Sequence, residues 1–251
     1  MQNNADLLFW HQRFLTQAKW SAQIRRHLLK EIGGYPIRQI LEVGCGTGAV
    51  LSDPIWEPYR RLGLDIYYPY LKHAQHNLPN IQFCQADGYH LPFAANSFDL
   101  CYTHYFFLWV EPEQALRELV RVTRSRGFIA ALAEPDYGGR IDYPPPLATL
   151  GQLQITAIQK AGGDPFIGRR LASLFSKSGL INLHVGVFGA YWIYPPDIEV
   201  TTSEWLALRF DLQHMLSPEE IDLWQTIDLN AWEKGERVLF VPTFFAYAQK
   251  P

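Results

Sequence analysis

The sequence predicts an α/β fold, a doubly wound and mostly parallel sheet of seven strands with helices on both faces. Short apolar runs alternate with helix-length segments, which is typical of parallel strands joined by right-handed crossovers. One run, Ile40 to Val43, leads directly into the turn Gly44-Cys45-Gly46-Thr47-Gly48, where a ligand can lie against the end of the sheet. With 251 residues, of which 48% are hydrophobic, the chain is expected to form one domain.

The elements can be placed in order along the chain. An amphipathic helix is expected over about residues 4–32, because apolar side chains recur there at three- or four-residue steps before Gly33-Gly34 and Pro36. Strands are expected at about residues 39–43, 61–66, 81–86, 98–103, 128–133, 181–189 and 243–248. Pro242 cannot donate to a sheet ladder and therefore stands just before the last strand.

A further helix is expected to begin at Pro112, which suits the first helical position. Arg121, Arg124 and Arg126 lead to Gly127 at its close, where basic side chains meet the negative end of the helix dipole. This helix is assigned a structural role.

The last third of the chain is expected to hold an inserted helical cap at about residues 195–236. Helical segments near 147–161 and 168–178 precede it. Thr201-x-x-Glu204 and Ser217-x-x-Glu220 are capping boxes, and each predicts a helix start.

Composition narrows the function classes. The net charge is −3, and Lys and Arg cluster only in pairs, which argues against a nucleic-acid partner. The sequence has no apolar run of the roughly 20 residues that span a bilayer, and Met1 to Asp6 do not resemble a signal peptide, so we expect a cytoplasmic protein. Cys45, Cys84 and Cys101 lack metal-ligand spacing, so we expect reduced thiols and no metal. Many aromatic residues lie outside the expected strands, among them Trp10, Trp20, Tyr105, Trp109, Tyr191, Trp192 and Trp205. Some aromatic residues are expected to line an apolar pocket, and most to pack the core and the cap.

The glycine turn is compatible with two cofactors. Gly44, Gly46 and Ala49 satisfy the dinucleotide pattern G-x-G-x-x-G/A, whereas Glu42 with Gly44, Gly46 and Gly48 gives E-x-G-x-G-x-G. Asp65 lies at the end of the next expected strand. An acid at this place would accept hydrogen bonds from ribose hydroxyls in either cofactor. The turn alone leaves the cofactor open.

Later motifs distinguish the two. Ala86-Asp87-Gly88, Leu91-Pro92-Phe93, Ser97-Phe98-Asp99 and Arg121-Val122 follow the turn in this order. Together with E-x-G-x-G-x-G, this order resembles the class I S-adenosylmethionine-dependent methyltransferases, with the ubiquinone/menaquinone-biosynthesis type as the most similar branch. The resemblance covers about residues 38–134 and implies a Rossmann-like fold. It departs from the family at Ser125-Arg126-Gly127, where the family has P-G-G.

The resemblance also implies roles for individual residues. Gly44, Cys45, Gly46 and Gly48 would form the floor beneath the cofactor, and Glu42 would hold its methionine amino group. Asp65 would accept both ribose hydroxyls. Ile66 would pack on the adenine, whose edge Asp87 and Gly88 would bind. Charged acceptors suit paired hydroxyls and an exocyclic amine.

Candidate catalytic and pocket residues lie outside these motifs. His104, at the carboxyl end of the fourth strand, is the candidate general base and a candidate cofactor contact. Tyr105 and Trp109 are expected to form pocket walls. Trp10, Arg13 and Trp20 share a face of the first helix, and Arg13 could meet the methionine carboxylate of the cofactor.

The predicted function is methyl transfer from S-adenosylmethionine to a small, apolar or aromatic molecule by a monomer or homodimer. Two alternatives belong to other classes. A nicotinamide-dependent oxidoreductase would use the dinucleotide pattern, and a non-catalytic protein would bind S-adenosylmethionine without turnover.

Overall fold

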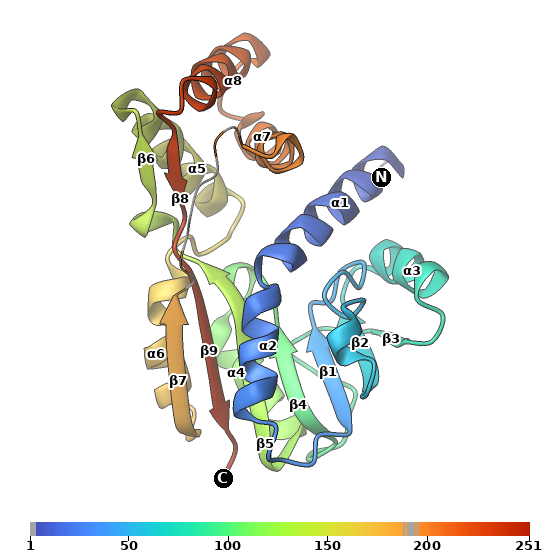
Figure 1. Cartoon of the computed structure of the whole chain (residues 1–251). Helices are drawn as coiled ribbons and strands as arrows, with labels where there is room; N and C mark the ends of the chain where they lie inside the picture. Colours follow the sequence, from blue (N-terminus) through green and yellow to red (C-terminus); the bar gives the residue numbers. More distant parts are fainter. Residues whose placement is uncertain (1–3, 188, 190–193, 195) are drawn as a thin grey trace.

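The computed structural model describes residues 4–187, 189, 194 and 196–251. A seven-stranded sheet forms its centre, with the strand order β3-β2-β1-β4-β5-β9-β7 (Figure 1). The strands are β1 (Gln39–Val43), β2 (Arg60–Asp65), β3 (Gln82–Gln85), β4 (Phe98–Thr103), β5 (Thr123–Pro135), β7 (Ile181–Val187) and β9 (Thr243–Gln249). The five N-terminal strands are parallel, and β9 is antiparallel to both of its neighbours. The predicted mostly parallel α/β sheet is therefore confirmed, as is the place of Pro242 directly before β9.

Helices cover both faces of the sheet (Figure 1). They are α1 (Asn4–Trp20), α2 (Ala22–Glu31), α3 (Tyr68–Asn77), α4 (Pro112–Val122), α5 (Ala148–Lys160), α6 (Ile167–Ser176), α7 (Ile198–Leu212) and α8 (Pro218–Glu233). Successive strand side chains point to opposite faces. Leu41 accordingly packs with α4 and α6, whereas Ile40 packs with Leu28 of α2 and Leu71 of α3.

The expected N-terminal helix is two helices that meet at Ser21. The Ser21 hydroxyl lies 3.3 Å from the carbonyl oxygen of Ala18 and 2.8 Å from His104 Nε2. A serine hydroxyl that binds helix carbonyls competes with the backbone and favours a break. In consequence α2 lies along the sheet, while α1 projects past its upper end (Figure 1).

The helix that begins at Pro112 ends earlier than expected. α4 stops at Val122, and β5 begins at the next residue. Arg124 instead pairs with Asp99, and Arg126 adopts a φ of 64°, in the left-handed region that favours glycine. The predicted cation-rich helix end is thus an irregular strand start, and Arg126 takes a glycine-like conformation where the family has P-G-G.

The cap is larger than the predicted 195–236. It includes α5 and a small sheet of β6 (Ile141–Tyr143) and β8 (Val238–Phe240) as well as α7 and α8 (Figure 1). Leu147 and Leu150 share a core with Trp205 and Leu208, so segments far apart in sequence build one cap.

One of the two predicted helix starts in the cap is confirmed and the other is wrong. At Ser217 both hydrogen bonds of the capping box to Glu220 are present. Thr201 instead lies within α7, which begins at Ile198. The described residues do not include residue 188, in the strand predicted over 181–189, or residue 195, at the start of the predicted cap. The aromatic residues Tyr191 and Trp192 also lie outside the described residues.

Among the described residues, no helix is long and apolar enough to cross a bilayer. No cluster of three or more potential metal ligands occurs in the same part of the chain. The three cysteines are free.

Candidate functional site

A glycine turn forms the floor of the candidate site at the carboxyl end of β1. Gly44, Gly46 and Gly48 have φ values of 76°, 51° and 78°, a conformation that glycine adopts without steric cost. The backbone N–H groups of Gly44 and Cys45 donate to the carbonyl oxygen of Leu64 at 2.8 and 2.9 Å. The turn is thereby anchored to the end of β2.

Two acidic residues lie at the ends of the neighbouring strands. Asp65 accepts hydrogen bonds from the backbone N–H groups of Gly46, at 2.8 Å, and Tyr67, at 2.9 Å. Burial raises the pKa of Asp65, and these amide donors offset part of that rise. Asp87 follows β3 and accepts the N–H of Tyr89 at 2.9 Å. Because the strands are parallel, both carboxylates lie at the same edge of the sheet as the glycine turn.

Glu42 lies beneath this edge and is almost inaccessible, with 2% of its surface exposed. The hydroxyl of Tyr102 donates to Glu42 Oε2 at 3.2 Å. Burial raises the pKa of Glu42 to about 8, although Tyr102 and Arg25 oppose the rise. Glu42 therefore takes up a proton near neutral pH.

Two aromatic rings cover the glycine floor. A Cβ placed on Gly44 would lie 2.6 Å from Phe106, and one on Gly88 would lie 2.8 Å from the same ring. Phe14 of α1 lies 3.0 Å from the Cβ position of Gly46. Any ligand that approaches the turn must therefore displace or slide beneath these rings. Sequence reasoning missed both phenylalanines, since only the fold brings them to the turn.

His104 is a poor candidate for a general base in this structure. It follows β4, and its Nε2 lies 2.8 Å from the Ser21 hydroxyl at the junction of α1 and α2. Burial, followed by the nearby Arg25 charge, lowers the pKa of His104 to about 3. The expectation of a pKa suited to proton abstraction is therefore wrong, because the half-buried imidazole lies near a cation.

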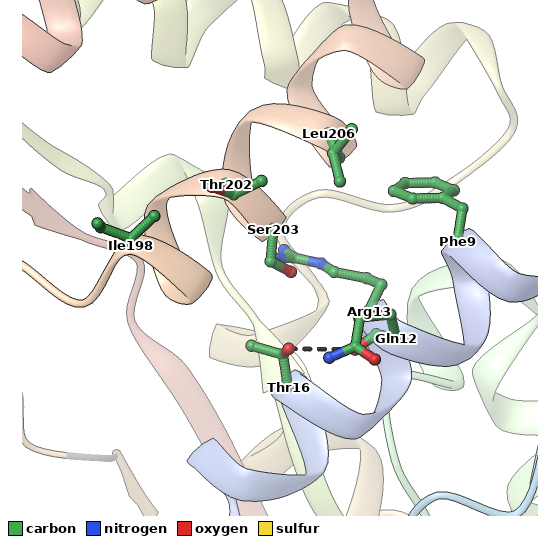
Figure 2. Close-up of a pocket in the computed structure, with 8 residues that line it drawn as sticks. All are labelled: Phe9, Gln12, Arg13, Thr16, Ile198, Thr202, Ser203 and Leu206. Carbon is green, nitrogen blue, oxygen red and sulfur yellow. Dashed lines mark hydrogen bonds between the residues drawn. The ribbon is translucent and has the colours of Figure 1, made fainter.

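Arg13 points toward the cap. Its Nη2 lies 3.0 Å from Glu204 Oε2, its Nη1 lies 3.4 Å from Ser203 Oγ, and its guanidinium carbon lies 5.0 Å from the centre of the Trp20 ring. Figure 2 shows this side chain reaching from α1 to α7. The ion pair with Glu204 joins α1 to α7 of the cap, and the expected contact of Arg13 with a cofactor carboxylate stays a prediction.

A pocket of about 260 Å³ lies between α1 and α7 (Figure 2). It is lined by Phe9, Gln12, Arg13 and Thr16 of α1 and by Ile198, Thr202, Ser203 and Leu206 of α7. Except for Arg13, these residues were not predicted, because nothing in the local pattern indicates that α1 meets α7.

The four aromatic pocket candidates are spread over different places. Trp10 packs edge-on against Phe210 of α7, with ring centres 4.9 Å apart, and Trp20 lies beneath Arg13. Tyr105 is half-buried, with a φ of 52° at the end of β4. Trp109 is 52% exposed. The structure thus has Trp10 and Trp20 on α1, with Trp20 40% exposed, and leaves Trp109 on the surface.

Comparison with known proteins gives a consistent result. Residues 41–131 match the family model described as a methyltransferase domain. The chain is 34% identical over 122 residues to demethylmenaquinone methyltransferase of Renibacterium salmoninarum, covering 45% of this chain and 49% of that protein. It is also 34% identical over 104 residues to phthiotriol/phenolphthiotriol dimycocerosates methyltransferase 1 of Mycobacterium ulcerans, covering 37% and 36% of the two chains. Residues 41–131 thus form a methyltransferase domain of the class I S-adenosylmethionine-dependent type. The aligned region spans about half or less of these relatives' lengths.

Solved structures share the methyltransferase fold over nearly the whole chain. Haemonchus contortus phosphoethanolamine N-methyltransferase 2 in complex with S-adenosyl-L-methionine superposes with a TM-score of 0.58 at 14% identity, covering 90% of this chain and 52% of that one. Geranyl diphosphate C-methyltransferase from Streptomyces coelicolor superposes with a TM-score of 0.57 at 12% identity, covering 92% and 77%. At such low identity the likeness concerns the fold.

The geometry suits the cofactor of this methyltransferase family, S-adenosylmethionine. The positive-φ glycine turn presents backbone without side chains, and two carboxylates lie beside it at the strand ends. The flat rings of Phe14 and Phe106 lie in the space that a Cβ would enter at Gly44, Gly46 and Gly88.

Proposed function

We propose that the chain transfers a methyl group from S-adenosylmethionine to a small-molecule acceptor. The single observation that carries this proposal is the glycine turn flanked by Asp65 and Asp87 at one edge of the sheet, in a chain of this family. When bound, S-adenosylmethionine supplies a methyl group on positively charged sulfur, which keeps the bonding electron pair as an acceptor lone pair forms the new bond.

The residues at the edge of the sheet would position this cofactor. Gly44 and Gly46 form its floor, and Asp65 accepts the ribose hydroxyls while its bonds to Gly46 and Tyr67 keep the carboxylate oriented. Ile66, which is 66% exposed beside Asp65, packs on the adenine. Asp87 and the Gly88 backbone bind the adenine edge, with hydrogen bonds to a charged acceptor favouring the exocyclic amine.

Two further residues act from beneath the floor. Glu42 lies close to the turn and, with its raised pKa, would become charged as the cofactor's amino group arrives, since a neighbouring cation favours the carboxylate. Cys45 is buried, and burial raises its pKa well above the usual value, so it stays a neutral thiol that packs the turn.

The acceptor would enter between α1 and α7, where the pocket has an apolar side formed by Phe9, Ile198 and Leu206. Positioning alone can supply much of the rate acceleration for an in-line transfer. With a pKa of about 3, His104 is neutral at physiological pH and too weakly basic to drive proton removal. We assign His104 the role of holding Ser21 in place. Because His104 does not take up the acceptor's proton, that proton leaves to solvent.

Turnover tests this proposal. The purified protein should release S-adenosylhomocysteine from S-adenosylmethionine when supplied with a panel of apolar and aromatic phenols, amines and carboxylates, and mass spectrometry should find an acceptor that is heavier by one methyl group. An Asp87→Ala variant, with its adenine contact removed, should turn over more slowly at limiting cofactor. Cofactor binding without product from any acceptor would favour a non-catalytic binding protein.

A further inference from the structure

We infer that the pocket between α1 and α7 selects acceptors with a carboxylate or a comparable oxyanion on an apolar body, and that Arg13 is the anchor for that group. This inference rests on the proposed function and adds the chemical class of the acceptor.

The lining of the pocket has one charged residue. Of the eight residues around it, only Arg13 carries a charge, and its neighbours Gln12, Thr16 and Ser203 are neutral hydrogen-bonding groups. The volume of about 260 Å³ corresponds to roughly nine molecules of liquid water, which is room for a small organic acceptor. An apolar body would meet Phe9 and Leu206 while an anionic end meets the guanidinium.

Arg13 retains donors for such a group. It is 6% exposed, and a guanidinium has five N–H donors in a fixed planar arrangement that matches a carboxylate. The contact with Ser203 Oγ, at 3.4 Å, is long, and only the 3.0 Å bond to Glu204 is short. Within the described part of the chain, Nε has no hydrogen-bond partner. Trp20 covers one flat face of the guanidinium at 5.0 Å.

Glu204 acts as the resident counter-ion of this cation. Its side chain is 16% exposed, so each charge would be costly to bury without the other. Glu204 is not among the pocket-lining residues, and therefore the pocket meets the cation of the pair rather than the anion. An incoming oxyanion would compete with Glu204 for the same N–H donors.

The anchor lies close to the cofactor floor. Phe14, the next residue of α1, covers Gly46. Burial raises the pKa of Tyr105 to about 12, and the Arg13 charge is the largest influence opposing that rise. Tyr105 follows β4 at the edge of the sheet where the cofactor would lie. A group held by Arg13 would therefore lie on the same helix as the ring that covers Gly46.

Three probes of equal chain length test the inference by calorimetry on protein saturated with S-adenosylhomocysteine: octanoate, octanamide and octylamine. Octanoate should bind at least about tenfold more tightly than octanamide, because hydrogen bonds to charged groups are the stronger ones, and octylamine should bind least. Arg13→Gln should remove the preference for octanoate. Arg26→Gln changes an exposed arginine of α2 and should leave the preference unchanged.

Glu204→Gln distinguishes an anchor from a structural ion pair. It removes the competing carboxylate and should tighten octanoate binding several-fold, whereas a merely structural pair predicts that Arg13→Gln and Glu204→Gln weaken binding alike. The double variant Arg13→Gln/Glu204→Gln leaves no unpaired buried charge, so it guards against misfolding and should bind octanoate and octanamide equally. Equal binding of the three probes by the wild type, preference for the amine, or no octanoate binding would overturn the inference. Failure to bind S-adenosylhomocysteine would instead count against the proposed function.

Discussion

Replacing Asp65 by alanine should weaken both the fold and the cofactor site, because one carboxylate serves both. The change leaves the N–H groups of Gly46 and Tyr67, now bonded at 2.8 and 2.9 Å, without their acceptor. Hydrogen bonds to charged groups contribute about 1.5–3 kcal/mol each. Asp65 is itself partly desolvated, as its raised pKa shows, which offsets part of this loss. We expect the free energy of unfolding to fall by about 1–3 kcal/mol.

The affinity for S-adenosylhomocysteine should fall roughly tenfold to a hundredfold in the same variant, because the ribose hydroxyls lose a charged acceptor. Urea denaturation gives the unfolding free energy, and isothermal titration calorimetry at a temperature where the variant is folded gives the affinity. Asp65→Asn retains one acceptor oxygen and should show smaller losses, and Glu57→Ala, at an exposed acid of the same region, should show neither. An alanine variant with wild-type stability and affinity would refute the assignment.

Three more changes test other parts of the account. Burial raises the pKa of Glu42 from 4.5 to about 8, so the wild-type fold loses stability as the pH rises from 4.5 toward 8 and the folded state gives up this proton. Glu42→Gln cannot ionise and should gain stability relative to wild type across this window, by up to about 1.4 kcal/mol per pH unit. A stability difference that does not change with pH, measured by urea denaturation, would contradict the raised pKa. His104→Gln should keep the wild-type pH dependence of kcat, because the pKa of His104 is about 3. An inflection between about pH 6 and 7 that the wild type shows and the variant lacks would establish His104 as the base. Ser217→Ala removes the capping box of α8 and should cost about 1 kcal/mol, measured by thermal denaturation. Ser173→Ala, at an exposed serine of α6, is the control, and equal melting temperatures of the two variants would show that this cap contributes little.

Local patterns were sufficient to predict the central sheet. The strands over 39–43 and 98–103 begin and end where predicted, because buried parallel strands are short apolar runs with turn residues at their ends. The glycine turn and the start of α4 at Pro112 also depend on local backbone preferences, and the structure has them where the sequence indicated.

Long-range contacts account for what the sequence could not show. Arg13 and Glu204 are 191 positions apart, so no spacing rule links them, and Arg13 looked equally suited to a cofactor carboxylate. Leu147 shares a core with residues of α7, a helix that begins about fifty residues later. The pKa of His104 depends on burial and on Arg25, neither of which follows from its position after β4.

The most direct test of the central claim is a calorimetric titration of the purified protein with S-adenosylmethionine, S-adenosylhomocysteine and NADH side by side. The account predicts saturable binding of the first two at one site per chain and no binding of NADH. Binding of NADH alone, or of none of the three, would contradict a cofactor site built on the glycine turn, Asp65 and Asp87.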